Sequence, residues 1–368
     1  MTVISITGEI TGIKYVPLLG TQLPEYDFDQ FDINRSPTAC VIRDGKYMFA
    51  LSKWTSPKRS RTYPFGRVYN TLKHSKKITV IPVVKDEGKL GDRDFIQWDT
   101  VSLMSLLEVF VIFAYYDNAQ RKGNKITRQK FENKCIIEKC KEIEQYHSSA
   151  LHWNLNELKT SFHHILDKAS DAYRKIEKQT GVQLHGQEGL KKFKDKIGQD
   201  VADFMQFSRQ KSEQAQKRES ITIQPKESLL SFTKATITIR NYLGGTYFLT
   251  VDEIKSVGNE IILIESKHSK KDALPEIGDI KDGLLKMILF CNLMNVTANG
   301  ISVNNTAMLV LTSPYIEGRM HSKDGGNNFD IFLQNNRFTV RQQKLIKLLF
   351  EEANRNNFTV EISYRANM

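Results

Sequence analysis

Two carboxylates and one lysine near residue 260 have the residue types and spacing of a small hydrolytic site. A two-residue loop at Gly258 and Asn259 suits the positive φ values of primed hairpin turns. In the register that this turn sets, Asp252 lies opposite Glu265 on the paired strand. Because side chains alternate along a strand, Lys267 points to the same face as Glu265. The sequence therefore predicts that Asp252, Glu265 and Lys267 converge.

Close carboxylates repel each other, so keeping both ionised requires a compensating cation. Either Lys267 or a divalent metal ion can supply that charge, and hard oxygen ligands suit Mg²⁺ or Mn²⁺. The alternative is a solvated ladder of ion pairs, which stabilises a strand pair by ~1 kcal/mol or less.

The elements around these residues are predicted from turn signals and apolar periodicity. In order, we expect strands at 247–256 and 260–266, a helix at 280–294, a strand at 307–312, a helix at 340–354 and a strand at 358–364. The apolar residues of the 280–294 segment recur at helical spacing. This order is a hairpin, then a helix and a strand, then a second helix and strand.

Residues 221–365 resemble the PD-(D/E)XK nucleases, whose restriction endonuclease members are the nearest analogues. The family motif is an Asp on one strand and then Glu or Asp, any residue and Lys on the next, matched here by Asp252 and by Glu265-Ser266-Lys267. The sequence departs from the family at Val251, where the family often has Pro. Glu253 adjoins Asp252 and would take its place if the strand register shifted by one residue. Glu227 is the candidate for the accessory acid that the family often carries on a preceding helix.

The resemblance implies a restriction-endonuclease-like mixed sheet flanked by helices. It also implies that Asp252, Glu265 and the carbonyl of Ser266 bind one or two Mg²⁺ ions, while Lys267 orients the attacking water. The expected function is that of a Mg²⁺-dependent endodeoxyribonuclease of restriction type, which hydrolyses phosphodiester bonds at a specific sequence in double-stranded DNA. A homodimer is expected, since one active site serves each strand of a palindrome, together with a DNA methyltransferase that acts on the same site.

We retain two alternative hypotheses for the function. The first is a structure-specific or phage-defence nuclease that acts on other DNA or on RNA. The second is a non-catalytic nucleic-acid-binding protein that retains the fold. Cleavage of plasmid DNA with Mg²⁺, lost on substitution of Lys267 or Asp252, separates the enzymes from the binder.

The chain has 368 residues and a formal charge of +11, which suits a polyanionic partner. The amino-acid composition and apolar pattern change twice along the chain. Residues 1–117 are predicted to form an α/β domain for target recognition, residues 118–220 a helical region that serves as spacer, dimer interface or DNA reader, and residues 221–368 the catalytic domain. The first part repeats the order of hairpin, helix, strand, helix and strand, with Leu51-Ser52-Lys53 at the place of the Glu-x-Lys motif, so a decayed duplicate is a second interpretation of it.

Residues 53–67 combine cations, aromatic side chains and prolines in one expected loop. Such a mixture suits phosphate contacts from Lys and Arg and base contacts from Arg and Tyr. The candidate DNA-binding residues are Lys53, Lys58, Arg59, Arg61, Tyr63 and Arg67.

No stretch reaches the ~18 to 20 consecutive apolar residues that a membrane-spanning helix needs. The segment 1–12 alternates Val and Ile with Thr and Ser and lacks the pattern of a secretory signal. We therefore expect a cytoplasmic protein with no membrane partner.

Overall fold

The computed structural model describes residues 4–57, 65–197, 202–206, 210, 233–242, 244–324 and 326–366. The chain divides into two compact units, each built from separate stretches of sequence. The large-sheet unit comprises residues 1–21, 61–69 and 211–368, and the small-sheet unit comprises residues 22–60 and 70–210. Within the described residues, no helix is both long enough and apolar enough to cross a membrane.

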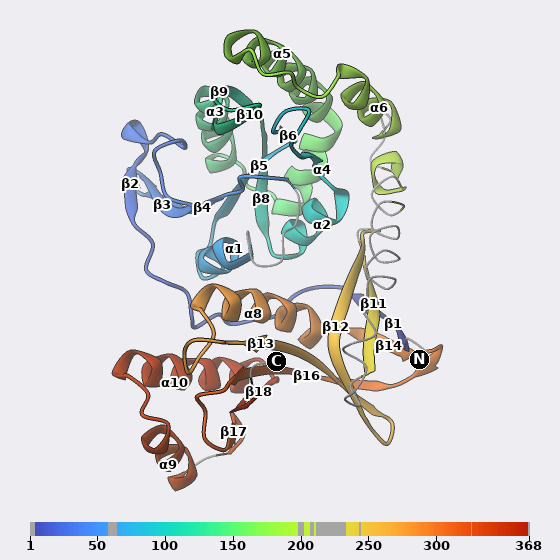
Figure 1. The fold of residues 1–368 in the computed structure, drawn as a ribbon. Helices are drawn as coiled ribbons and strands as arrows, with labels where there is room; N and C mark the ends of the chain where they lie inside the picture. The colour runs from blue at the N-terminus through green and yellow to red at the C-terminus, as the bar shows by residue number, and fades with distance from the viewer. Residues whose placement is uncertain are drawn as a thin grey trace. The chain divides into compact units, whose positions relative to one another are not determined.

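The large-sheet unit is a mixed sheet with helices (Figure 1). Its strands are ordered β15-β14-β1-β11-β12-β13-β16-β18-β17. The elements are β1 (Ile4–Ile10), β11 (Thr233–Asn241), β12 (Thr246–Val257), β13 (Glu260–His268), α8 (Ile277–Cys291), β14 (Met294–Ala298), β15 (Ile301–Ser302), β16 (Asn304–Ser313), β17 (Arg319–His321), α9 (Asn327–Asn335), α10 (Val340–Arg355) and β18 (Thr359–Tyr364).

The centre of this sheet combines antiparallel and parallel pairing. Strands β11, β12 and β13 form an antiparallel meander, and β13, β16 and β18 are parallel. Parallel neighbours need a crossover, and α8 and α10 provide the two that are required here. Figure 1 shows α8 running along β13 and β16. Residues such as Leu263, Leu309 and Val360 are fully buried in these strands, as expected for a sheet covered by helices.

The hairpin of β12 and β13 has the predicted register. Val257 pairs with Glu260 across the turn, and Glu253 pairs with Ile264 further along. Gly258 has a φ of +61°, a value that glycine adopts without steric cost. The local turn signal therefore fixed which residues face each other.

Strand β1 belongs to the large sheet, although the sequence analysis assigned it to a separate N-terminal domain. Ile4 to Ile10 pair in parallel with Ala235 to Asn241 of β11. Ile6 and Ile10 are fully buried, so the sheet gains apolar area from the start of the chain. This long-range pairing explains why the start of the chain belongs to the large-sheet unit and not to a separate N-terminal domain.

The small-sheet unit contains a sheet ordered β2-β3-β4-β5-β8. Its elements are β2 (Glu25–Asp27), β3 (Ala39–Asp44), β4 (Tyr47–Lys53), β5 (Lys77–Pro82), β6 (Val84–Asp86), β7 (Arg93–Phe95), α2 (Trp98–Leu106), β8 (Val109–Ala114), β9 (Tyr116–Lys122), β10 (Lys125–Phe131), α3 (Asn133–Glu144), α4 (Ala150–Thr160), α5 (Phe162–Thr180) and α6 (Gln187–Ile197), with α1 (Phe65–Thr71) at the boundary between the units. Strands β4, β5 and β8 are parallel. The expected hairpin at residues 40–54 is present, with Asp44 paired to Tyr47.

The region expected to be helical from residue 117 begins with a two-stranded ribbon, in which β9 pairs with β10 as a sheet of its own among the described strands. The turn lies at Gly123-Asn124, with Lys122 paired to Lys125. This Gly-Asn pair is the same hairpin signal as Gly258-Asn259. The helical expectation was wrong here because the polar composition concealed the short alternation of the strands.

Candidate functional site

The three residues singled out at the hairpin meet in the structure. The Ser266 backbone N–H donates to Asp252 Oδ2 at 2.9 Å, which ties the Asp252 carboxylate to β13. Lys267 Nζ lies 2.9 Å from Glu265 Oε1. Glu265 is buried and Asp252 is half-buried. Glu265 and Lys267 are thus in direct contact, and the negative charge of the Asp252 carboxylate is close enough to raise the pKa of Glu265.

An irregularity in β12 lies at the same place. Thr233 of β11 pairs with Ile254, whereas Ala235 pairs with Val251, so two residues of β12 oppose one of β11. Those two residues are Asp252 and Glu253. A bulge of this kind redirects side chains and is frequent beside functional sites. Glu253 forms an ion pair with Lys255 at 3.4 Å and does not join the cluster.

Helix α8 contributes two further charged groups that the sequence analysis did not select. Lys267 Nζ donates to Asp282 Oδ2 at 2.7 Å, and Lys286 Nζ donates to Glu265 Oε2 at 2.6 Å. Asp282 and Lys286 are one helical turn apart, so they lie on the same face of α8. Two charged residues four positions apart in a largely apolar helix were the sequence signal that could have identified Asp282 and Lys286.

Gly283 gives the Lys267 side chain room to pass α8. A Cβ atom at this position would lie 3.4 Å from Lys267 Cε and 2.7 Å from Leu309 Cδ1. The helix can therefore approach β13 and β16 closely only because residue 283 has no side chain.

Burial and charge oppose each other within the cluster. Burial raises the pKa of Glu265; Lys286 and Lys267 lower it, while the negative charge of Asp252 adds to the increase. Burial also raises the pKa of Asp282, against the effect of Lys267. For Lys267, burial by itself would lower the pKa, but Glu265 and Asp282 outweigh it and raise the pKa above its ordinary value. Lys267 is thus held as an ammonium ion.

The donors fit a hard divalent cation of the kind that keeps several of its own waters. Mg²⁺ is commonly held by one or two carboxylates together with waters and substrate phosphate oxygens. Asp252 and Glu265 supply two carboxylates, and no hydrogen bond to the second oxygen of Asp252 is found among the described residues. Nowhere in the described ranges do three or more His, Cys, Asp or Glu side chains gather as a ligand set. A cation at Glu265 has to share or displace the ammonium group of Lys286 or Lys267.

The predicted DNA-binding loop is only partly within the described residues. Lys58, Arg59, Arg61 and Tyr63 lie outside them, as does Glu227. Lys53 Nζ donates to the carbonyl oxygens of Ile33 at 2.5 Å and Ser36 at 2.6 Å, so it anchors a neighbouring loop of its own unit. Arg67 lies on α1 and is half-buried. The small-sheet unit contains Lys53 and the large-sheet unit contains Arg67.

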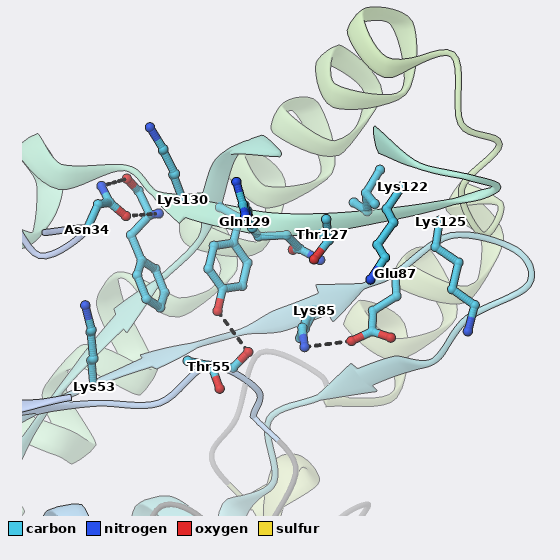
Figure 2. A pocket seen from close by; sticks show the side chains of 14 residues that line it. Asn34, Lys53, Thr55, Lys85, Glu87, Lys122, Lys125, Thr127, Gln129 and Lys130 are labelled. Atoms are coloured by element: carbon cyan, nitrogen blue, oxygen red, sulfur yellow. Dashed lines mark hydrogen bonds and ion pairs between the residues drawn. The ribbon is translucent and has the colours of Figure 1, made fainter. Parts of the chain in front are cut away.

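Lys53 also lines a cavity of about 670 Å³ within the small-sheet unit (Figure 2). One wall is β10, and residues of β4 and β6 contribute to the other side. We call this cavity the basic cleft, because its lining contains six cations, Lys53, Lys85, Lys122, Lys125, Arg128 and Lys130, and one carboxylate, Glu87. Sequence reasoning missed the cleft since it treated residues 118–131 as helical.

Comparisons of the chain with protein-family models, with curated proteins and with solved structures found no match.

Proposed function

We propose that the protein is a Mg²⁺-dependent endodeoxyribonuclease of restriction type, with Asp252, Glu265 and Lys267 as its catalytic residues. The observation that carries the proposal is the grouping of Asp252, Glu265 and Lys267 on the β12–β13 hairpin, where Lys267 pairs with Glu265 and the charge of Asp252 acts on Glu265. The order of antiparallel meander, crossover helix α8 and parallel strand β16 supports a restriction-endonuclease-like sheet.

The proposed roles follow from charge and position. Asp252, Glu265 and the carbonyl of Ser266 would hold the metal ion, which polarises a phosphate and lowers the pKa of a bound water. Lys267 stays protonated beside Glu265 and Asp282, so it can orient a water and offset negative charge that develops on the phosphate. Asp282 fixes the position of the Lys267 ammonium group by a charge-assisted hydrogen bond.

The substrate and partners are part of the same proposal. The charge of +11 favours a nucleic-acid substrate, and we propose double-stranded DNA read at a specific sequence. A homodimer would place one active site on each strand. A methyltransferase acting on the same site would protect the host DNA.

A second candidate is a non-catalytic nucleic-acid-binding protein, and one observation favours it. Both oxygens of Glu265 are taken by ammonium groups, Oε1 by Lys267 and Oε2 by Lys286, and its side chain is only 3% exposed. A closed ion-pair cluster of this kind can serve structure alone.

Incubation of the full-length protein with plasmid DNA and Mg²⁺ distinguishes the nuclease from the non-catalytic nucleic-acid-binding protein. Discrete fragments that disappear with EDTA, with Asp252→Ala and with Lys267→Ala would support the restriction nuclease. The matched control is Lys255→Ala, which removes an exposed lysine from the same hairpin and should cut as wild type does. A smear would indicate non-specific cleavage, and retarded but uncut DNA would favour the binder.

A further inference from the structure

The ribbon of β9 and β10 is fixed to its unit by specific contacts on one side. Tyr116 and Phe131 stack with ring centroids 4.4 Å apart where the ribbon begins and ends. Asn34 exchanges two hydrogen bonds with the Phe131 backbone, at 2.8 and 3.0 Å. Gln129 donates to the carbonyl of Asp86 at 2.7 Å and accepts from the Tyr173 hydroxyl at 2.8 Å. The ribbon is therefore a rigidly positioned element.

The rest of the ribbon presents positive charge and amides. Residues 118–130 contain five Lys or Arg residues and no Asp or Glu. Cross-strand pairing places Gln120 with Thr127 and Asn118 with Lys130, and alternation along β9 puts Asn118 and Gln120 on one face. Of these, Asn118, Gln120 and Lys130 are exposed. Lys, Arg, Asn and Gln are the side chains that contact DNA phosphates and base edges.

Arg128 lies at an irregularity of the ribbon. From Thr127 to Lys130, β10 advances three residues while β9 advances two, so β10 carries an extra residue. Arg128 has a φ of +48°, a left-handed value that is uncommon outside glycine and is concentrated at functional sites. Its guanidinium donates to Gln120 Oε1 at 3.4 Å, which directs it toward the exposed face.

The basic cleft lies against this ribbon, as Figure 2 shows for Lys122, Lys125 and Lys130. Its carboxylate, Glu87, is already paired with Lys85 at 2.7 Å, and Lys53 is held by backbone carbonyls. The other four cations, Lys122, Lys125, Arg128 and Lys130, form no ion pair with any described residue. Four cations that form no ion pair among the described residues, placed around one cavity, attract a polyanion.

We propose that the β9–β10 ribbon and the basic cleft form a surface that binds double-stranded DNA. Lys122, Lys125, Arg128 and Lys130 contact the phosphates, and a two-stranded ribbon has dimensions that the major groove admits. The choice of duplex DNA as ligand rests on the proposed function, but the charge argument does not depend on the catalytic residues.

Binding of a 30-base-pair duplex of random sequence to the full-length protein tests this surface, in EDTA so that no cutting occurs. The test variant is Arg128→Gln with Lys130→Gln, which removes two charges and keeps most of each side chain. The control is Lys159→Gln with Lys178→Gln, which removes two charges from exposed positions on α4 and α5. Thermal melting of both variants checks that they fold.

The ribbon variant should bind at least about tenfold more weakly than wild type, and the control should lose about threefold or less. If both side chains touch phosphates, the slope of log K against log salt becomes shallower by roughly 1.8. An unchanged slope with a changed sequence preference in a selected duplex pool would place the same side chains on base edges, and supports the surface equally.

Equal weakening by the two variants, or tighter binding of an RNA duplex of the same sequence, would overturn the proposal. The two proposals can fail separately. If the protein cleaves plasmid DNA but the ribbon variant binds duplex DNA as tightly as wild type does, only the proposed binding surface is wrong. If binding depends on the ribbon but the protein does not cleave plasmid DNA, only the proposed nuclease function is wrong.

Discussion

At the scale of single residues, the buried Glu265 carboxylate is paired with two ammonium groups, those of Lys267 and Lys286. Lys286 reaches Glu265 Oε2 from α8, while Lys267 pairs with the other oxygen, Oε1. Each ammonium group offsets the charge of a buried carboxylate, and each also competes with a cation that needs the same oxygens.

We expect Lys286→Met to bind Mg²⁺ more tightly than wild type. Removing one ammonium group from Glu265 should increase the affinity about tenfold, equivalent to roughly 1.4 kcal/mol. Isothermal titration at pH 8 without DNA measures this, with Lys255→Met as a control that should bind as wild type does. Weaker binding by Lys286→Met would show that Lys286 orients Glu265 rather than competing for it.

Lys281, on the same helix, gives a prediction about pH. Burial lowers the pKa of Lys281 from 10.5 to about 8, although Glu352 acts in the opposite direction. Between pH 8 and 10.5, Lys281 is protonated in the unfolded chain and mostly neutral in the folded protein. Its contribution to the free energy of unfolding therefore increases as pH rises through this range. Urea unfolding at pH 7.5 and 10 should show that Lys281→Met is stabilised relative to wild type at pH 7.5 and loses part of that advantage at pH 10. An identical difference between the two proteins at both pH values would contradict this assignment.

At the scale of elements, the close packing of α8 on β13 and β16 depends on one glycine. Gly283→Ala would place a Cβ atom 2.7 Å from Leu309 Cδ1, so the helix or the leucine must move. We expect a loss of about 1 to 3 kcal/mol of stability, which overpacking of a dense core typically costs. Chemical denaturation measures the change.

Gly278 in the first turn of α8 is the matched control. A Cβ atom there meets nothing within 4 Å, so Gly278→Ala should be neutral or stabilise the helix by up to about 1 kcal/mol. If Gly283→Ala were as stable as Gly278→Ala, the packing of α8 would be looser than we describe. If the proposed nuclease activity is present, Gly283→Ala should also lower it, because Lys267 passes the same position.

At the scale of the whole molecule, three distant stretches of chain meet at one buried carboxylate of the large-sheet unit. Glu352 of α10 accepts hydrogen bonds from the hydroxyls of Tyr15 and Tyr69 and from the backbone N–H groups of Leu18 and Leu19. Glu352 is fully buried. It therefore joins the N-terminal segment, α1 and α10.

We expect Glu352→Ala to destabilise the protein by about 3 to 5 kcal/mol, since it leaves several buried donors without an acceptor. The neighbouring Glu351 is exposed and pairs with Arg355 at 2.5 Å, so Glu351→Ala should change stability by less than about 0.5 kcal/mol. Thermal and urea unfolding compare the two. Equal effects would mean that the hydrogen bonds of Glu352 do not hold the segments together.

The two units also repeat one order of elements. Apart from the short strands β6, β7, β14, β15 and β17 and the helix α9, the β3–β4 hairpin is followed by α1, β5, α2 and β8, and the β12–β13 hairpin is followed by α8, β16, α10 and β18. In each, the second hairpin strand and the two later strands are parallel. Leu51 and Ser52 precede Lys53 without a carboxylate, which agrees with a duplicate that lost its acids. This interpretation stays a prediction.

By itself, the sequence determined the β12–β13 hairpin, because a Gly-Asn turn and strand alternation are local and set the register that runs from Val257 with Glu260 to Glu253 with Ile264. Only the tertiary structure decided which face of α8 meets β13, and hence that Asp282 and Lys286 join the cluster. Packing across the sheet sets the rotation of a helix, and periodicity alone does not specify it. The same holds for β1, whose partner β11 lies more than 200 residues away in the chain. No local pattern encodes a pairing of that range, since the buried area of the assembled sheet selects it.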